Sequence, residues 1–126
     1  MSIKIDVSIG ELWDKFTILM IKKEKIKDTE KRKYVLKEIE ILNEKMKLFL
    51  LHREPLFDDL KKVNEKLWSI EDQLRIKEKN QIFDQEFIDL ARAVYFTNDD
   101  RAKIKKEINI RYDSEIHEVK DYVDYI

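Results

Sequence analysis

The sequence contains no cysteine, a single glycine and a single proline. Without cysteine, disulfide bonds and thiolate chemistry are excluded, and a reducing compartment is the expected environment. Gly10 and Pro55 alone offer little material for hairpin turns or glycine-rich phosphate loops. These absences argue against an all-β fold and against a dinucleotide-binding α/β fold.

An excess of one charge and a long hydrophobic run are also lacking. The 26 basic and 27 acidic side chains almost cancel, so overall charge gives no reason to expect a polyanionic partner. No apolar run approaches the roughly 18 residues of a membrane helix, and the N-terminus lacks the apolar core of a signal peptide. We therefore expect a cytoplasmic protein that binds neither a membrane nor nucleic acid.

Apolar and charged residues are present in almost equal shares, 43% and 42% of 126 residues. This mixture is typical of helices with one apolar stripe and a charged outer face. We predict a single all-α domain over residues 1–126, built from an antiparallel helical hairpin, three further helices and one short N-terminal strand. The strand is expected over residues 3–9, where Ile3, Ile5 and Val7 alternate with polar residues.

The start signals of the first three helices are clear. Ser8 and Glu11 form a capping box for a helix that runs to about Ile26, and Asp28 or Thr29 caps the second. Pro55 ends the second helix and suits the first turn of the third. Both helices carry heptad seams: Val35, Ile39, Leu42, Met46 and Phe49, then Leu56, Leu60, Val63, Leu67, Ile70 and Leu74. We predict that these two seams form the antiparallel hairpin.

The last third of the chain is predicted to hold two shorter helices. Asp84 caps the fourth, and the segment 97–100 supplies a break and a new cap for the fifth. Residues 113–126 are compatible with a continued helix, or their last five residues, 122–126, with a strand that pairs with the N-terminal strand.

Nucleophilic catalysis has no recognisable residue set, because cysteine is absent and the two histidines, His52 and His117, match no local motif. A magnesium site is the remaining catalytic alternative. Its ligands would be the pairs Glu11 and Asp14, and Glu86 and Asp89, on different helices. Such spacing arises often by chance among 27 acidic residues, and Glu11 already serves the capping box. We assign no cofactor and no catalytic residue.

A mixed polar stripe lies beside the seam of the third helix. Trp68, Glu71 and Arg75 follow helical spacing, with Asn64 before them. An ordinary ion pair between Glu71 and Arg75 explains part of this pattern. A partly buried tryptophan among charges can also hold a flat polar ligand.

A second polar cluster surrounds the predicted break between the fourth and fifth helices. Arginine forks and amides around one bend could form a small anion site, although ordinary capping and surface charge are equally compatible with the pattern. The residues concerned are Arg92, Tyr95, Asn98, Asp99, Arg101, Lys105 and Asn109.

Several of these motifs together resemble an uncharacterised family of small all-helical proteins from bacteria and viruses, catalogued as a domain of unknown function. The motifs are Ser8-Ile9-Gly10-Glu11-Leu12 with Asp14-Lys15, Asn64 to Trp68-x-Ile70-Glu71-Asp72, Phe83-Asp84, Ala91-Arg92-x-Val94-Tyr95, Asn98-Asp99-x-Arg101-Ala102 and Ile108-Asn109. The resemblance spans most of the chain and implies the fold, but it carries no established activity. It implies that the polar positions belong to one shared pattern.

The sequence thus favours non-catalytic binding, including sequestration, of a small anionic or nucleotide-like molecule by a homo-oligomer. The expected ligand contacts are Trp68, Glu71, Arg75, Arg92, Tyr95, Asn98, Asp99, Arg101, Lys105 and Asn109. Self-association is expected through residues 3–9. Two alternatives stay open: a structural or adaptor module whose helices pack on another protein, and a magnesium-dependent nucleotide hydrolase.

Overall fold

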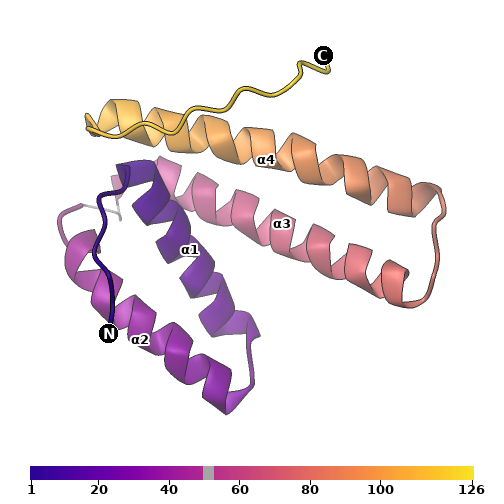
Figure 1. Cartoon of the computed structure of the whole chain (residues 1–126), viewed down its shortest axis with the longest axis horizontal. Helices are drawn as coiled ribbons and strands as arrows, with labels where there is room; N and C mark the ends of the chain where they lie inside the picture. Colours follow the sequence, from indigo (N-terminus) through magenta and orange to yellow (C-terminus); the bar gives the residue numbers. More distant parts are fainter. Residues whose placement is uncertain (50–52) are drawn as a thin grey trace.

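The computed structural model describes residues 1–49 and 53–126, and these ranges contain four α-helices. They are α1 (Ile9–Lys25), α2 (Thr29–Met46), α3 (Pro55–Lys79) and α4 (Gln85–Arg111). Figure 1 shows two antiparallel hairpins, α1 with α2 and α3 with α4, and α1 also packs against both helices of the second hairpin. The all-α prediction is confirmed. Among the described helices, none is long and apolar enough to cross a membrane.

The predicted starts of the first four helices are confirmed. The Ser8 hydroxyl accepts a hydrogen bond from the Glu11 amide at 3.1 Å, and α1 ends with Ile26 as its C-cap. Asp28 caps α2, and Asp84 caps α4 by accepting from the Phe87 amide at 2.9 Å. Each cap satisfies an amide that has no partner within its own helix.

The predicted pairing of the second and third helices is wrong. The structure pairs α3 with α4, while α2 packs along α1 and joins the central core through Met46 in its last turn. The apolar side of each predicted seam does face inward: Val35 and Met46 are buried on α2, and Leu60 and Ile70 on α3. A heptad pattern identifies the side of a helix that packs, but it does not identify the helix that covers it.

The predicted break at residues 97–100 is also wrong, because α4 continues through it. No proline or glycine interrupts this stretch, and Thr97 is 2% exposed within the helix. The side chains that read as caps have other partners: Asn98 accepts a hydrogen bond from Arg101, and Asp99 accepts one from Tyr125. Burial of one helix face outweighs the weak local preference for a turn.

The core lies where the first half of α1 meets the beginning of α3 and the end of α4. Trp13 is fully buried there, with ring centroids 5.2 Å from Phe49, 5.9 Å from Phe57 and 5.0 Å from Tyr112. Leu60 and Ile108 are also fully buried in this cluster. Edge-to-face rings and aliphatic side chains together fill the junction of the three helices.

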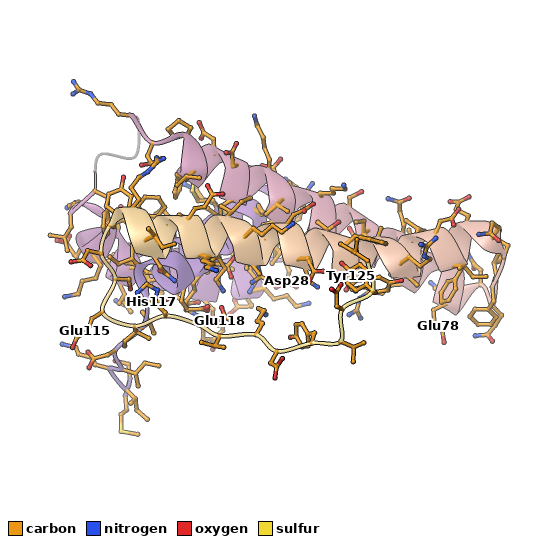
Figure 2. All side chains as sticks on the ribbon, turned by 90° about the horizontal axis from the view of Figure 1, so that it is seen from above. Asp28, Glu78, Glu115, His117, Glu118 and Tyr125 are labelled. Atoms are coloured by element: carbon orange, nitrogen blue, oxygen red, sulfur yellow. The ribbon has the colours of Figure 1, made fainter. Side chains whose placement is uncertain are left out.

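Neither terminal segment forms regular structure. The predicted N-terminal strand is absent, since residues 1–8 precede α1 without any strand pairing in the described part of the chain. Residues 113–126 form an extended tail that runs back along α4 (Figures 1 and 2). Ser114 fastens the start of the tail, because its hydroxyl accepts from the Ile9 amide at 3.1 Å and donates to the Ile116 carbonyl at 2.8 Å.

Candidate functional site

A cluster of charged and polar side chains around the buried Asp14 and Lys105 joins α1, α3, α4 and the tail. We call it the Asp14 cluster, and its members are Glu11, Asp14, Thr17, Asn64, Arg101, Lys105 and Glu118. Asp14 is 1% exposed. Its Oδ1 accepts from Asn64 Nδ2 at 2.8 Å and from Arg101 Nε at 2.9 Å, while Arg101 Nη2 donates to Oδ2. One carboxylate thereby connects three helices, because both of its oxygens are engaged by the two other helices.

Lys105 is the second centre of the Asp14 cluster and is 6% exposed. Its Nζ lies 2.8 Å from Glu11 Oε2, 3.0 Å from Glu118 Oε2 and 3.5 Å from Asp14 Oδ2. Three carboxylates against two cations leave one net negative charge. A buried ammonium is tolerated only when carboxylates replace its water shell, and here they come from α1 and from the tail.

The ionisation of these groups follows from their contacts. Burial raises the pKa of Asp14, but the hydrogen bonds from Arg101 and Asn64 and the nearby cations outweigh it, so the net pKa lies below 3.8. For Lys105, burial lowers the pKa, yet Glu11 and Glu118 outweigh it and bring the net value above 10.5. Both groups therefore stay charged at neutral pH. The contribution of Asp14 to stability is present above its unfolded pKa and is lost as pH falls through the lower folded value.

Gly10 lets α1 approach α4 closely beside the Asp14 cluster. Its amide donates to Asn109 Oδ1 at 2.7 Å. A Cβ atom at this position would lie 2.8 Å from the Lys105 carbonyl oxygen and 3.0 Å from Asn109 Oδ1. The single glycine of the chain thus stands where two helix backbones nearly touch.

A hollow of about 310 Å³ opens next to the Asp14 cluster, between α1, α3 and α4. We call it the Trp68 hollow. It is lined by Ile18, Asn64, Leu67, Trp68, Glu71, Asp72, Arg75 and Arg101. Trp68 is half-buried, and the Arg75 guanidinium stands at the exposed rim, 3.6 Å from Glu71. Arg101 belongs both to this wall and to the Asp14 cluster, so its guanidinium is held in place from behind.

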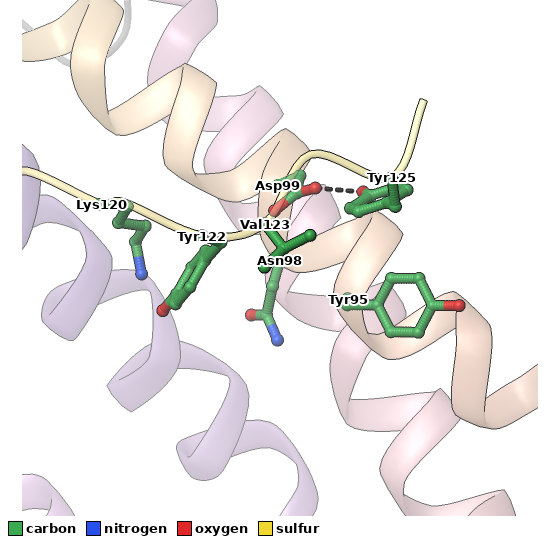
Figure 3. A pocket seen from close by; sticks show the side chains of 7 residues that line it. All are labelled: Tyr95, Asn98, Asp99, Lys120, Tyr122, Val123 and Tyr125. Carbon is green, nitrogen blue, oxygen red and sulfur yellow. Dashed lines mark hydrogen bonds between the residues drawn. The ribbon is translucent and has the colours of Figure 1, made fainter.

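A larger hollow of about 500 Å³ lies between α4 and the tail (Figure 3). This tail hollow is lined by Tyr95, Asn98, Asp99, Lys120, Tyr122, Val123 and Tyr125. The Tyr125 hydroxyl donates to the Asp99 carboxylate, and that hydrogen bond raises the pKa of Tyr125 to about 12. Its ring packs edge-on against Tyr95 at 5.2 Å and Phe96 at 5.0 Å. These contacts fasten the far end of the tail to α4.

The ten residues predicted to contact one ligand do not gather in one hollow. Trp68, Glu71, Arg75 and Arg101 line the Trp68 hollow, which brings the two predicted clusters together in part. The tail hollow takes Tyr95, Asn98 and Asp99. The two hollows meet at Asn98 and Arg101, where Asn98 Oδ1 accepts from Arg101 Nη1 at 3.4 Å.

The remaining three predicted contacts serve the fold or lie elsewhere. Lys105 and Asn109 are buried and bind α1. Arg92 stacks its guanidinium over Phe96, 5.7 Å from the ring centroid, and lines neither hollow.

The four carboxylates of the magnesium alternative do not form one site within the chain. Asp14 is bound by Arg101 and Lys105, whereas Glu86 lies 3.8 Å from Lys77 near the turn between α3 and α4. Asp89 accepts from the neighbouring Gln85. Within residues 1–49 and 53–126, no three His, Asp or Glu side chains converge as a metal site would require. His117 lies exposed on the tail, and His52 lies outside the described residues.

The sequence interpretation missed the central role of Asp14 and Asn64, which meet across a sequence separation of 50 residues. One local signal could have indicated the position. A lone glycine in the first turn of a strongly capped helix has no turn to form, so it marks a close approach of another backbone. The partner of that backbone, residues 105–109, becomes visible only in the folded chain.

The fold and the site define a class: a four-helix protein of two hairpins, with a buried charge cluster behind a half-buried tryptophan. The chain belongs to DUF6165, a family of unknown function whose model matches residues 3–126. This match confirms the resemblance to an uncharacterised family over nearly the whole chain. No curated protein and no solved structure matches it.

Proposed function

We propose that the chain binds a small anionic or nucleotide-like molecule in the Trp68 hollow without transforming it, and that it does so as a homo-oligomer. The observation that carries this proposal is the meeting of Trp68 and Arg75 of α3 with Arg101 of α4 around one hollow. An aromatic face with guanidinium groups beside it suits a planar ring joined to an anionic group. The volume of about 310 Å³ lies at the lower end for small-molecule sites.

Several polar groups around the hollow can contact different parts of a ligand. Two of the three guanidinium nitrogens of Arg101 are engaged by Asp14, while Nη1 has a long contact of 3.4 Å to Asn98. That nitrogen and the exposed Arg75 fork are the donors available to an anionic group. Glu71 and Asp72 can accept hydrogen bonds from ligand hydroxyls. Their negative charge favours a ligand with one compact anionic group over a highly charged polyanion.

Binding without chemistry is supported by the ionisation of the neighbouring charges. Efficient proton transfer calls for a pKa near the working pH. Asp14 has a lowered pKa and Lys105 a raised one, because each is paired within the Asp14 cluster. Both act as fixed charges, and Asp14 holds the Arg101 guanidinium in place beside the hollow.

The direct test begins with native mass spectrometry of the purified protein for a co-purified small molecule, followed by calorimetric titration with AMP and with inorganic phosphate. We expect AMP to bind, and Trp68→Leu and Arg75→Ala each to weaken binding about tenfold or more, from lost stacking and lost charge. Arg92→Ala is the matched control, since Arg92 lines neither hollow. Equal AMP affinity in all three variants and the wild type would remove the ligand from this hollow.

An adaptor function is the second candidate, and exposed apolar side chains on α2 favour it. Tyr34 and Ile41 of α2, and Leu48 just beyond its C-terminal end, are spaced seven residues apart and are 80%, 53% and 77% exposed. Such a stripe is typical of a helix that packs on another protein. If binding of a partner protein is the function, Ile41→Asp should abolish it while Trp68→Leu leaves it intact. Loss of AMP binding in Trp68→Leu but not in Ile41→Asp favours the small-molecule site.

A further inference from the structure

Residues 3–7 form an extended arm that has no partner within the described part of the chain. Figure 2 shows the indigo N-terminal segment projecting away from the helices. Ile3 is 81% exposed, Ile5 76% and Val7 43%. In the described structure, no hydrogen bond involves a backbone amide or carbonyl group of residues 3–7. An extended segment with free backbone groups and alternating side chains is a template for strand addition.

We infer that this arm pairs with the same arm of a second copy of the chain, antiparallel and centred on Ile5. In this register Ile5 faces its own symmetry mate and Ile3 faces Val7 of the other copy, all on one side. On the opposite side, Lys4 of each copy faces Asp6 of the other. The arm is thus complementary to itself in charge and in apolar pattern, as a two-fold interface requires. The inference specifies the self-association within the proposed function and is independent of the ligand.

Charge selects this register over its alternatives. Antiparallel pairing centred on Lys4 or on Asp6 places that residue against its own copy, like charge against like. A shift by one residue sets apolar side chains opposite polar ones. Parallel pairing in register opposes Lys4 to Lys4 and Asp6 to Asp6. Only the arrangement centred on Ile5 forms two cross-strand ion pairs and one continuous apolar side.

The interface is short, and the expected dimer is therefore weak. Two paired strands of five residues are marginal in water, so the dimer should populate only at high protein concentration and low salt. The pairing places six apolar side chains from Ile3, Ile5 and Val7 of the two copies on one face. These side chains are exposed in the monomer, and association reduces their exposure to water.

A charge-swap experiment tests the register. Sedimentation equilibrium of the full chain, up to about 1 mM to detect weak association, is compared for the wild type, Lys4→Asp, Asp6→Lys and the double variant. Each single variant opposes like charges and should weaken the dimer about tenfold. The double variant should restore it. An equimolar mixture of the two single variants should also restore it, because one arm then carries two acids and the other two bases.

The control is Lys33→Asp, which changes the same charge at a 67% exposed side chain of α2 and should leave the dimer unchanged. The arm lies outside the helices, so the helical circular dichroism should be identical for the wild type and the arm variants. A wild type that stays monomeric overturns the pairing, as does a dimer indifferent to the single variants. Weakening without recovery on mixing overturns the register. AMP titration of the double variant tests the Trp68 hollow separately, because failure of the arm pairing should leave AMP binding unchanged.

Discussion

The two ends of the α3–α4 hairpin differ in how their side chains are covered. At the near end, α1 lies against both helices, and Leu60 and Ile108 are fully buried. At the far end, beside the turn between α3 and α4, no third helix of the described residues covers the pair, and Ile76 and Phe83 are 60% and 54% exposed. Stability is therefore concentrated where α1, α3 and α4 meet. At the far end, α3 and α4 are stabilised by their contacts with each other.

The Trp68 hollow lies on the border between these two regions. Ile18 contributes to its wall from α1, while the other lining residues come from α3 and α4. Behind this border, the Asp14 cluster fixes Arg101 through a buried carboxylate. A site in this position combines a rigid back wall with an open rim. The covered end holds the Arg101 side chain in a fixed orientation, and the uncovered end leaves the hollow open to a ligand.

Replacement of Asp14 should produce the largest loss of stability. Asp14→Ala leaves Lys105 buried and Arg101 half-buried without their central carboxylate, and we expect a cost of about 3–5 kcal/mol in the free energy of unfolding. Urea denaturation gives the value. Asp59→Ala on the exposed side of α3 is the control and should change it by less than about 0.5 kcal/mol. Similar costs for both variants would mean that the covered end does not depend on its charge cluster.

Two truncations on the same helix test the comparison of the ends directly. Leu60→Ala removes a fully buried side chain and should cost about 2–5 kcal/mol. Ile76→Ala shortens a side chain that is 60% exposed and should cost less than about 1 kcal/mol. Both are measured by urea denaturation. A large effect at Ile76 would indicate that another surface, such as a second copy, covers the far end.

Gly10→Ala compares the helix propensity of alanine with the close packing of α1 against α4. In a helix, this change normally stabilises by about 0.5–1 kcal/mol, because glycine loses more backbone freedom on folding. Here the new Cβ would lie 2.8 Å from the Lys105 carbonyl oxygen, and backbone cannot yield as a side chain can. We expect a net loss of about 1–2 kcal/mol by thermal or urea unfolding. A stabilised variant would show that α1 can move away from α4 at little cost.

The sequence predicted what is local in this fold. Ser8, Asp28 and Asp84 cap helices where the pattern placed them, because a cap depends on residues three positions apart. It failed where distant segments compete. The apparent cap at Asn98 and Asp99 has partners in Arg101 and in the tail, and the apolar side of α3 faces α1 and α4 instead of α2. The sequence carries no direct record of such pairings.

The candidate site shows the same division. Trp68, Glu71 and Arg75 share one helix face, and the helical period predicted that they line one hollow together. Their meeting with Arg101, and the buried support from Asp14 and Asn64, depends on the packing of three helices. The sequence predicts a bend at residues 97–100 that gathers the polar side chains of residues 92–109 around one site. Because α4 is continuous through this segment, these polar side chains are instead spread over two hollows and the Asp14 cluster.

The smallest expected effect concerns the tail. The exposed hydrogen bond between Tyr125 and Asp99 fastens the far end of the tail to α4. The hydrogen bond raises the pKa of Tyr125 to about 12 from an ordinary 10.0. Since the folded value is the higher one, the fastening is fully present below pH 10.0 and is lost as pH rises through about 12. The difference between the ultraviolet titrations of the wild type and Tyr125→Phe isolates this group from the other tyrosines.

Asp99→Asn should return the pKa of Tyr125 toward 10.0, because it removes the charged acceptor while keeping the shape of the side chain. Asp100→Asn is the matched control: this neighbouring acid also raises the pKa of Tyr125, but less than Asp99 does, so the shift should be small. A Tyr125 that titrates at the ordinary value in the wild type would place the tail away from α4. The tail hollow would then lose one wall, while the Trp68 hollow, which contains no tail residue, would keep all of its lining.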